Sequence, residues 1–376
     1  MHRKIIIVGA GPIGCYLGQL LKSYGFSPLL LEEHAEVGRP VACAGILGKD
    51  VFKHSQIPLS KKSIINVIDG AKVQFKNSAF LLKRDGVAYI VKRDIFDQEL
   101  SHGLNIEFNT RFEGAEKNGP GYNVKTNNGE YYTDLLIGAD GPHSKVRNQL
   151  GFSSALKIYR GLQYRIKKEI PDRDRVEVIY SKPFSLFTWV IPEGNGVIRV
   201  GTMAENPYQE LENFIKERRI DGEIIERNAG PIPIGTSDLV FENNAALVGD
   251  AGCQLKPITS GGIYYGMRGA EHLARAIKDG NLKQYETDWQ EAYGQEVKFC
   301  LMLRSLTEGL GEDVLLKLFN YLKDNVHLVE KIGDFENHSS IAWSLMSNFK
   351  TYSTIGTLIM GVLKRPQVLM KALQRK

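Results

Sequence analysis

A single thiol in an irregular loop is the first feature of this sequence that suggests chemistry. Cys43 lies in VGRPVACAG (37–45), where a proline and two glycines oppose helix formation. A thiol there is a polarizable, weakly acidic group, although a free cysteine is also commonly a small buried hydrophobe. The remaining cysteines, Cys15, Cys253 and Cys300, are widely separated and form no CxxC pair. We therefore expect neither a disulfide framework nor a zinc site, and the scattered histidines indicate no other metal.

A glycine cluster near the start has the spacing of a dinucleotide-binding turn. Gly9, Gly11 and Gly14 form GxGxxG directly after the apolar run KIIIV and before a helical pattern. The first glycine permits a tight turn, the second lets the backbone approach a pyrophosphate, and the third allows close packing of helix on strand. Glu32 ends the next apolar run, where a carboxylate can accept both ribose hydroxyls of an adenosine. These features predict a dinucleotide site but do not separate NAD from FAD.

Two later turns also place a carboxylate and glycines directly after an apolar strand. DLLIGADG ends at Asp140 and Gly141, and AALVGDAG contains Asp250, with Gly261 and Gly262 leading into a helix. A carboxylate at such a strand end can accept hydrogen bonds from a ribityl chain, and a helix N-terminus favours the electron-rich end of a flavin. The three turns, in this order, predict FAD.

Taken together, these turns resemble those of FAD-dependent oxidoreductases of the p-hydroxybenzoate hydroxylase type, over roughly residues 4 to 280. VKRDIFDQEL is similar to the arginine-containing turn of that superfamily, which implies that Arg93 lies near the FAD. The alternative for Arg93 is a solvated residue at a helix start.

Two further segments resemble the geranylgeranyl reductase family. GRPVACAG is similar to its cysteine-containing loop, and PFSLFTWVIPEGNGVIRVG is similar to its Tyr-x-Trp-x-Phe-Pro segment. The resemblance implies that Cys43 faces the isoalloxazine and that Phe187, Trp189 and Pro192 contact the substrate, with Trp189 and Pro192 in the tunnel wall. Plain core packing is the alternative for Trp189. Phe187 replaces the family's Tyr and Ile191 its Phe, which puts a tyrosine hydroxyl in doubt and also makes the segment similar to that of flavin-dependent halogenases.

The candidate site follows from the three turns and the two resemblances. Cys43 is the candidate catalytic residue. The predicted cofactor-binding residues are Gly9, Ala10, Gly11, Gly14, Glu32, Cys43, Ala44, Arg93, Asp140, Gly141, Asp250, Gly261, Gly262 and Ile263.

The family implies hydrogenation of isoprenoid double bonds in geranylgeranyl lipids, such as a digeranylgeranylglycerophospholipid, by reduced FAD. Burying the prenyl chain, excluding water and positioning a proton source would be the tasks of the protein. Two other functions stay open: an FAD-dependent monooxygenase or halogenase, and a membrane-docked electron-transfer flavoprotein. No second GxGxxG is present, so NAD(P)H, ferredoxin or another electron-donor protein could reduce the flavin.

Positioning these residues requires an α/β fold with discontinuous parts. Alternating strands and helices predict a Rossmann-like flavin domain, and the aromatic strands after residue 155 predict an inserted, mainly antiparallel sheet. A helical region follows. We expect an FAD-binding domain in residues 1–55, 90–152 and 240–282, a substrate domain in 56–89 and 153–239, and a helical region in 283–376.

Composition and charge limit the partners. The 376 residues carry a net charge of +5 with well-mixed acids and bases, which does not indicate nucleic acid. The final 37 residues, from Ser340, are apolar at helical spacing and end in a basic tail. This pattern predicts either an interfacial helix on anionic headgroups or a helix packed on protein. With no apolar run long enough to span a bilayer, we expect a cytoplasmic protein that can rest on the inner membrane face.

Overall fold

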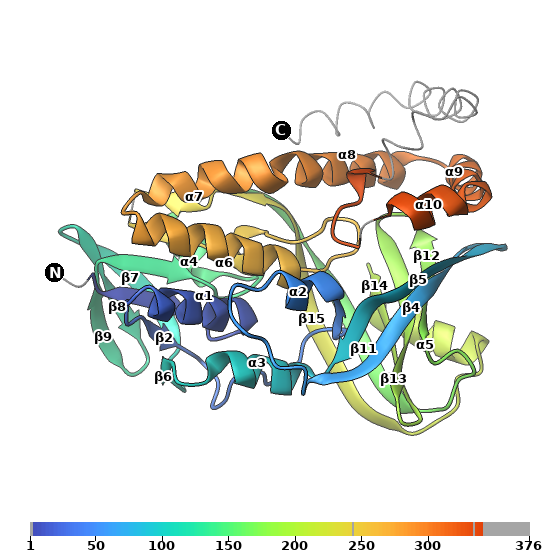
Figure 1. Cartoon of the computed structure of the whole chain (residues 1–376), viewed down its shortest axis with the longest axis horizontal. Helices are drawn as coiled ribbons and strands as arrows, with labels where there is room; N and C mark the ends of the chain where they lie inside the picture. The colour runs from blue at the N-terminus through green and yellow to red at the C-terminus, as the bar shows by residue number, and fades with distance from the viewer. Residues whose placement is uncertain (1–2, 243, 334, 341–376) are drawn as a thin grey trace.

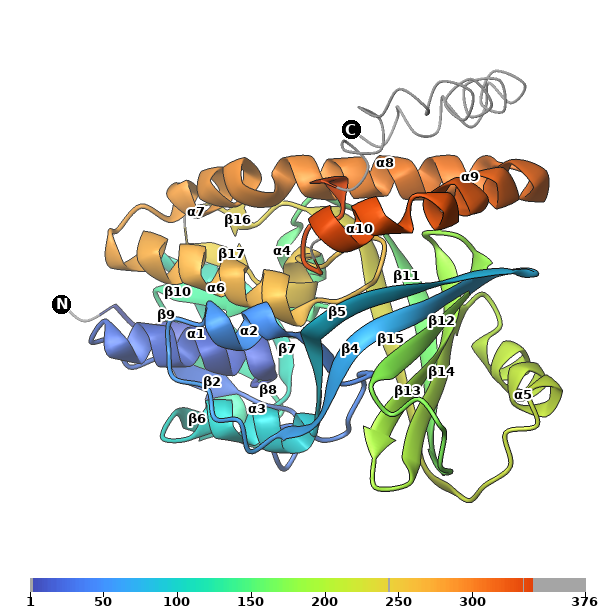
Figure 2. The same ribbon diagram turned by 45° about the vertical axis from the view of Figure 1, so that its right-hand side comes forward.

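Two large β-sheets occupy opposite ends of the molecule, and a long helix runs across both. The computed structural model describes residues 3–242, 244–333 and 335–340. In two views α8 (Gln295–Gly309) lies along the top, over the helices of one half and beside the strands of the other (Figures 1 and 2). The predicted interfacial helix lies outside the described residues. Within those residues, no helix is both long and apolar enough to cross a membrane.

The six-stranded sheet brings the three sequence turns to one edge. Its order is β16-β17-β10-β1-β2-β6, and all neighbours are parallel except β16 and β17. Val8 pairs with Leu31 on one side and with Gly138 on the other, and Gly138 pairs with Leu247. The carboxyl ends of four strands are thus in register, so the turns that follow them meet, as expected at the ligand-binding edge of a doubly wound sheet. The strands are β1 (Ile5–Val8), β2 (Leu29–Leu31), β6 (Asn105–Glu107), β10 (Leu135–Gly138), β16 (Val240–Phe241) and β17 (Ala245–Leu247).

The eight-stranded sheet is built from two separated stretches of chain. Its order is β15-β11-β14-β13-β12-β4-β5-β3, antiparallel except where β12 pairs with β4. This one parallel contact joins the hairpin of the earlier stretch to the later strands. The strands are β3 (Ile46–Gly48), β4 (Ile64–Phe75), β5 (Ser78–Val91), β11 (Ser154–Lys167), β12 (Arg175–Lys182), β13 (Leu186–Gly194), β14 (Val197–Ala204) and β15 (Ile224–Ser237).

A small meander and the helices complete the fold. The meander is β7 (Phe112–Asn118), β8 (Gly121–Thr126) and β9 (Gly129–Thr133), and Asn127 and Asn128 form its second turn, as is common where NNG joins two strands. The helices are α1 (Pro12–Ser23), α2 (Lys49–Lys53), α3 (Arg93–Ser101), α4 (Lys145–Leu150), α5 (Pro207–Glu217), α6 (Ile263–Lys278), α7 (Leu282–Trp289), α8, α9 (Glu312–Asp324) and α10 (Val326–Ile332), with a 3-10 turn at Gly249–Gly252 and a π turn at Gln290–Gly294.

The predicted fold class is confirmed: a Rossmann-like part of discontinuous segments, a mainly antiparallel sheet and a helical region after it. Apolar residues of β1, α1 and α6 form the largest core cluster together with residues of β5 and α8. The two halves therefore share one hydrophobic core, which holds their facing surfaces at a fixed distance.

Candidate functional site

One cavity of about 660 Å³ lies between the carboxyl edge of the six-stranded sheet and the inner face of the eight-stranded sheet. Most of the predicted site lines it, although the contributing residues are far apart in sequence. The predicted residues that line it are Gly11, Cys43, Ala44, Arg93, Gly141, Phe187, Trp189, Asp250, Gly261, Gly262 and Ile263. The predicted residues that do not are Gly9, Ala10, Gly14, Glu32, Asp140 and Pro192.

The first turn has the geometry of a pyrophosphate cradle. Gly9 has a φ of +97°, and a Cβ there would lie 2.5 Å from the carbonyl oxygen of Ala139. A Cβ on Gly14 would lie 2.1 Å from the carbonyl oxygen of Gly9, so helix and strand could not approach as they do. A Cβ on Gly11, by contrast, would meet nothing within 4 Å, and α1 begins there without a side-chain cap. Free N–H groups on an open surface suit a phosphate.

Glu32 directly follows β2 and is almost fully buried. Its carboxylate accepts a hydrogen bond from the backbone N–H of Ala10 at 2.8 Å and another from that of His34 at 3.0 Å. The His34 Nδ1 lies 2.7 Å from the same carboxylate. Glu32 therefore also holds the glycine turn in place, a role beyond the predicted contact with ribose.

The two later carboxylates have different roles. Asp140 accepts hydrogen bonds from the Ser144 hydroxyl at 2.6 Å and from the N–H of Lys145 at 2.7 Å, so it caps α4. Asp250 lines the cavity, and among the described residues no side-chain hydrogen bond reaches its carboxylate. Burial raises the pKa of Asp250 to about 6, against the opposing charge of Arg93. Asp250 is thus the acid of the two that is available to a ligand.

Cys43 and Arg93 both line the cavity, Cys43 from the loop 37–45 and Arg93 from the start of α3. The Cys43 sulfur accepts a hydrogen bond from the N–H of Gly45 at 3.3 Å, which orients the thiol within its loop. Arg93, the first residue of α3, donates to both oxygens of Asp97 at 3.0 and 2.9 Å. Burial lowers the pKa of Arg93, but the Asp97 carboxylate more than reverses this, so the pKa lies above its usual value and the guanidinium stays charged.

β13 presents alternate side chains to the cavity. Phe187, Trp189 and Ile191 line it, with the Phe187 and Trp189 rings 5.8 Å apart. Pro192 is buried but does not line the cavity, because neighbouring side chains of a strand point to opposite faces. Ile191, rather than Pro192, therefore forms the wall, and the period of the strand was the signal that would have identified it.

Trp189 is linked to the thiol loop by a residue that the sequence did not single out. The indole Nε1–H donates to the Gln163 side chain at 2.8 Å, and the Gln163 amide donates to the carbonyl of Cys43 at 3.5 Å. A Cβ on Gly201 would lie 2.4 Å from the indole, so this glycine makes room for the ring. The amide of Gln163 lies between the two predicted residues and fixes their separation.

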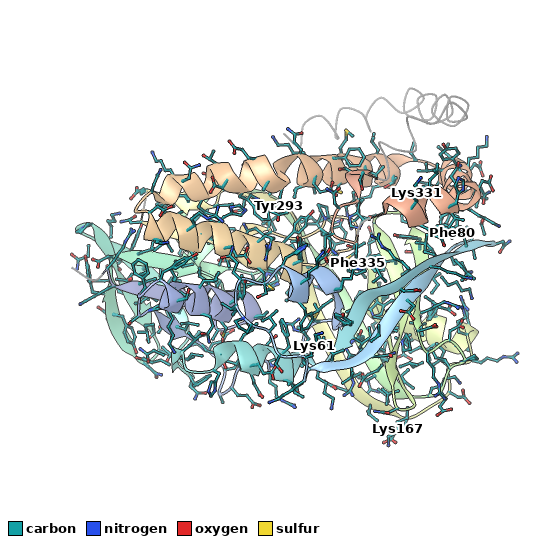
Figure 3. All side chains as sticks on the ribbon, in the orientation of Figure 1. Lys61, Phe80, Lys167, Tyr293, Lys331 and Phe335 are labelled. Carbon is teal, nitrogen blue, oxygen red and sulfur yellow. The ribbon has the colours of Figure 1, made fainter. Side chains whose placement is uncertain are left out.

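A buried ion pair in the cavity wall was also missed. Lys256, in the third turn, is 4% exposed, and its ammonium lies 2.9 Å from the carboxylate of Glu336. The same ammonium donates to the carbonyl of Phe335 at 2.9 Å and lies 4.3 Å from the centre of its ring. Figure 3 shows Phe335 near the middle of the molecule, where the two halves meet. In the sequence, only the lysine within the turn QLKPITSGG pointed to a buried charge at this place. Its partner, Glu336, could not be identified because it lies about eighty residues further along the chain.

One group of side chains has metal-ligand types, a feature that the sequence did not indicate. Ligand atoms of Glu296, Cys300 and His338 lie within 4.8 Å of one another. The Glu296 carboxylate, however, accepts hydrogen bonds from the backbone N–H groups of His338 and Ser339 at 2.7 and 3.0 Å. Burial raises the pKa of Cys300, so its thiol stays protonated and donates to Glu296. These hydrogen bonds hold the segment after α10 against α8, and they account for the short distances among the three side chains.

These features fit FAD. Gly11 and Gly141 leave open space where a Cβ would stand, Asp250 offers an acceptor, and α1 and α6 both begin at the cavity without side-chain caps. Glu32 stands beside the first turn, and Cys43 lies on the cavity surface. An extended dinucleotide with a flavin at the sheet junction matches this arrangement of donors, acceptors and glycines.

Comparisons with known proteins agree with this geometry. The FAD binding domain family matches residues 89–280, and the NAD(P)-binding Rossmann-like domain matches residues 7–51. An uncharacterized protein of Methanocaldococcus jannaschii is 32% identical, covering 92% of this chain and 95% of that protein. Digeranylgeranylglycerophospholipid reductase 1 of Methanococcoides burtonii is 28% identical, over 92% of this chain and 95% of its own. The crystal structure of a geranylgeranyl bacteriochlorophyll reductase-like protein from Thermoplasma acidophilum superposes with a TM-score of 0.78 at 22% identity, covering 94% and 99% of the two chains.

Proposed function

Since this chain belongs to the geranylgeranyl reductase family of FAD-dependent oxidoreductases, we propose that it hydrogenates the geranylgeranyl chains of a digeranylgeranylglycerophospholipid or a closely similar prenyl lipid. The observation that carries this proposal is the shape and lining of the cavity. It continues from the flavin-facing turns along the inner face of the eight-stranded sheet, where it is walled by aliphatic side chains.

The apolar part of the cavity suits a branched hydrocarbon chain. Its volume lies within the range of about 300–1,000 Å³ that is usual for ligand sites, before allowance for a flavin. Aliphatic walls remove a prenyl chain from water without leaving polar groups unpaired. The wall residues from β4, β5 and β12 are Ile68, Ala71, Val73, Leu82, Val87, Val176 and Val178.

Two basic side chains lie at the far part of the cavity. Lys83 and Arg84 line it from β5 and are exposed, and neither side chain forms an ion pair among the described residues. A carboxylate beside them, that of Glu330, accepts from the backbone N–H of Lys83 at 2.8 Å. Arg84 and Val91 are seven positions apart along β5, a path of roughly 20 Å at the usual rise of a strand. An anionic headgroup at Lys83 and Arg84 would leave the prenyl chain extending toward Arg93 and the flavin side.

The residues of the three turns would hold FAD, which when bound and reduced would supply the hydride for one carbon of the alkene. The tasks of the chain's own residues would be to exclude water, to hold the alkene and to position the acid that protonates the other carbon. Cys43 faces the cavity with its sulfur oriented by Gly45, and we propose that it tunes this proton and hydride geometry. Phe187, Trp189 and Ile191 hold the chain against that side of the cavity.

The decisive experiment is anaerobic incubation of the dithionite-reduced holoprotein with a digeranylgeranylglycerophospholipid, followed by mass spectrometry. Addition of one H₂ per double bond supports the proposal. Oxygen- and NAD(P)H-dependent hydroxylation or halogenation of an aromatic substrate, without lipid reduction, would establish a monooxygenase or halogenase instead. Reoxidation of the reduced protein by a quinone, with the lipid unchanged, would establish an electron-transfer flavoprotein.

The role of Cys43 has its own test. Cys43→Ala and Cys43→Ser should both lower the rate of lipid reduction and alter the pattern of reduced double bonds, while FAD stays bound. Unchanged rate and product pattern in both variants would show that the thiol is only a packing residue.

NAD(P)H, ferredoxin and other reductants can be compared as electron donors in the same assay. Sedimentation with anionic vesicles tests the proposed membrane contact.

A further inference from the structure

A buried arginine of the eight-stranded sheet reaches across to the cofactor half. Arg199 lies on β14 and is 5% exposed. Its guanidinium donates to the carbonyl of Ala44 at 2.7 Å and to the carbonyl of Val91 at 3.1 Å. Ala44 is in the loop of Cys43, and Val91 ends the strand that leads to Arg93. One side chain thus holds both segments that bring Cys43 and Arg93 to the cavity.

The loop is shaped around this guanidinium. Gly45 has a φ of +71°, and a Cβ there would lie 1.9 Å from an Arg199 nitrogen. The N–H of Gly45 is also the group that donates to the Cys43 sulfur, and its carbonyl accepts from Val91. Any movement of the guanidinium would therefore move the residue that orients the thiol.

The guanidinium of Arg199 is also paired with a buried carboxylate. Its Nε donates to Glu193 at 2.8 Å, and Glu193 also accepts from Arg165. Burial raises the pKa of Glu193, but the hydrogen bonds from Arg165 and the charge of Arg199 outweigh it, so the pKa lies below its usual value. A planar fork with donors on two edges can hold a carboxylate and two carbonyls at once, which an ammonium cannot do in the same geometry.

We propose that Arg199 is a positioning residue, which fixes the Cys43 loop and the β5 end against the substrate sheet so that the thiol and Arg93 face the same part of the cavity. The inference rests on the proposed function, in which this part of the cavity holds the flavin and the alkene. By this proposal, a residue of the eight-stranded sheet fixes the position of residues on the cofactor side of the cavity.

The test compares Arg199→Lys with Arg165→Lys in the full-length, FAD-loaded protein. Both replaced arginines contact Glu193, but only Arg199 contacts the loop. The readouts are the rate of Cys43 alkylation by a neutral maleimide, corrected with Cys43→Ser, and the dissociation constant of FAD. The other three cysteines are buried, so Cys43 dominates the signal. No lipid is needed, so a failure of the proposed reduction is seen separately in the anaerobic assay.

In Arg199→Lys, alkylation should accelerate about tenfold and FAD affinity should fall by a similar factor, the effect expected for loss of a charge-assisted hydrogen bond. Arg165→Lys should stay within about twofold of the unaltered protein, because Arg165 is bonded to Glu193 and Glu226 and not to the Cys43 loop. Equal alkylation rates in Arg199→Lys and the unaltered protein would overturn the proposal, as would an equal increase in Arg165→Lys.

If Arg199→Lys shows no cooperative thermal transition, and so does not fold, the same two measurements are made on the double variant Glu193→Gln/Arg199→Gln. It removes both charges together and so leaves neither of them buried alone, while Arg165 keeps Glu226. A folded double variant with faster alkylation supports positioning. One that alkylates at the unaltered rate shows that Arg199 serves only stability.

Discussion

The carboxyl edge of the six-stranded sheet and the inner face of the eight-stranded sheet line the same cavity, but they are built differently. The edge relies on glycines and backbone N–H groups at strand ends, in register across four strands. The face presents aliphatic and aromatic side chains to the cavity, and buried charged or amide groups, such as Arg199 and Gln163, hold these strands and the facing loop in place. Backbone sites depend on local conformation, whereas side-chain sites depend on partners distant in sequence.

Because of this difference, substitutions in the two regions should impair the protein in different ways. A larger side chain at the edge should collide with the backbone or with the bound cofactor. A change on the face, or in the ion pair between Lys256 and Glu336, should act by removing one partner of a buried polar group. The following variants test that distinction, beginning with the largest expected effect.

Gly14→Ala should be the most damaging. Its Cβ would lie 2.1 Å from a backbone oxygen, which no side-chain rotation relieves, so the cost should exceed the roughly 3 kcal/mol upper range of ordinary overpacking. Thermal unfolding of the apoprotein measures it. Gly11→Ala is the matched control, because its Cβ meets nothing within 4 Å. It should unfold like the unaltered apoprotein yet bind FAD much more weakly. Equal stability of the two variants would contradict the steric account.

Lys256→Met should destabilise the protein by about 3 kcal/mol, because it leaves the carboxylate of Glu336 buried without its ammonium. Denaturant unfolding measures the loss. The double variant Lys256→Met/Glu336→Gln should recover most of it, since the buried carboxylate that lost its ammonium is then replaced by a neutral amide. If the double variant is as unstable as Lys256→Met, packing rather than charge is responsible.

Asp250 should make the stability of the apoprotein depend on pH. Burial raises its pKa from 3.8 to about 6, so the folded state binds this proton more tightly than the unfolded chain. The stability is complete below the unfolded pKa and is lost as pH rises through about 6, by at most about 3 kcal/mol. Asp250→Asn should remove this decline. We would compare the Tm of both apoproteins at pH 4 and pH 7, and parallel curves would refute the assignment.

Trp189→Phe should have the smallest effect. It keeps an aromatic wall but loses the hydrogen bond to Gln163, worth about 1 kcal/mol, or roughly fivefold in kcat/KM for the lipid. Gln163→Leu should give a similar loss, and the double variant should add little to either. FAD affinity should fall less than in Arg199→Lys, because Gln163 reaches the Cys43 loop through one long hydrogen bond of 3.5 Å. If FAD affinity falls in step with kcat/KM, the hydrogen bond between Trp189 and Gln163 also positions the Cys43 loop, as proposed for Arg199.

Much of the edge could be predicted because each turn carries its own local signal. GxGxxG after KIIIV requires positive φ at Gly9 and close packing at Gly14, and both are present. Asp140 and Asp250 follow equivalent strands and have equivalent sequence signals, yet one caps α4 and the other faces the cavity. Local sequence does not distinguish them, because the difference depends on which N–H groups reach each carboxylate.

Little of the face could be predicted beyond β13. Alternation along this strand identifies Phe187, Trp189 and Ile191 as neighbours on one side, and it would have excluded Pro192. Nothing in the sequence pairs Lys256 with Glu336 or Arg199 with Ala44, because these partners are separated by many elements. Such contacts follow from topology rather than from spacing.

The sequence by itself determined the backbone turns, the order of strands and helices and the choice of FAD as cofactor, because glycine conformation, strand alternation and helix periodicity are local properties. Only the tertiary structure decided which charges are buried together, which carboxylate stays available and how the eight-stranded sheet contacts the thiol loop. Burial makes each of those groups depend on a partner, and the fold alone brings the partners within hydrogen-bonding distance.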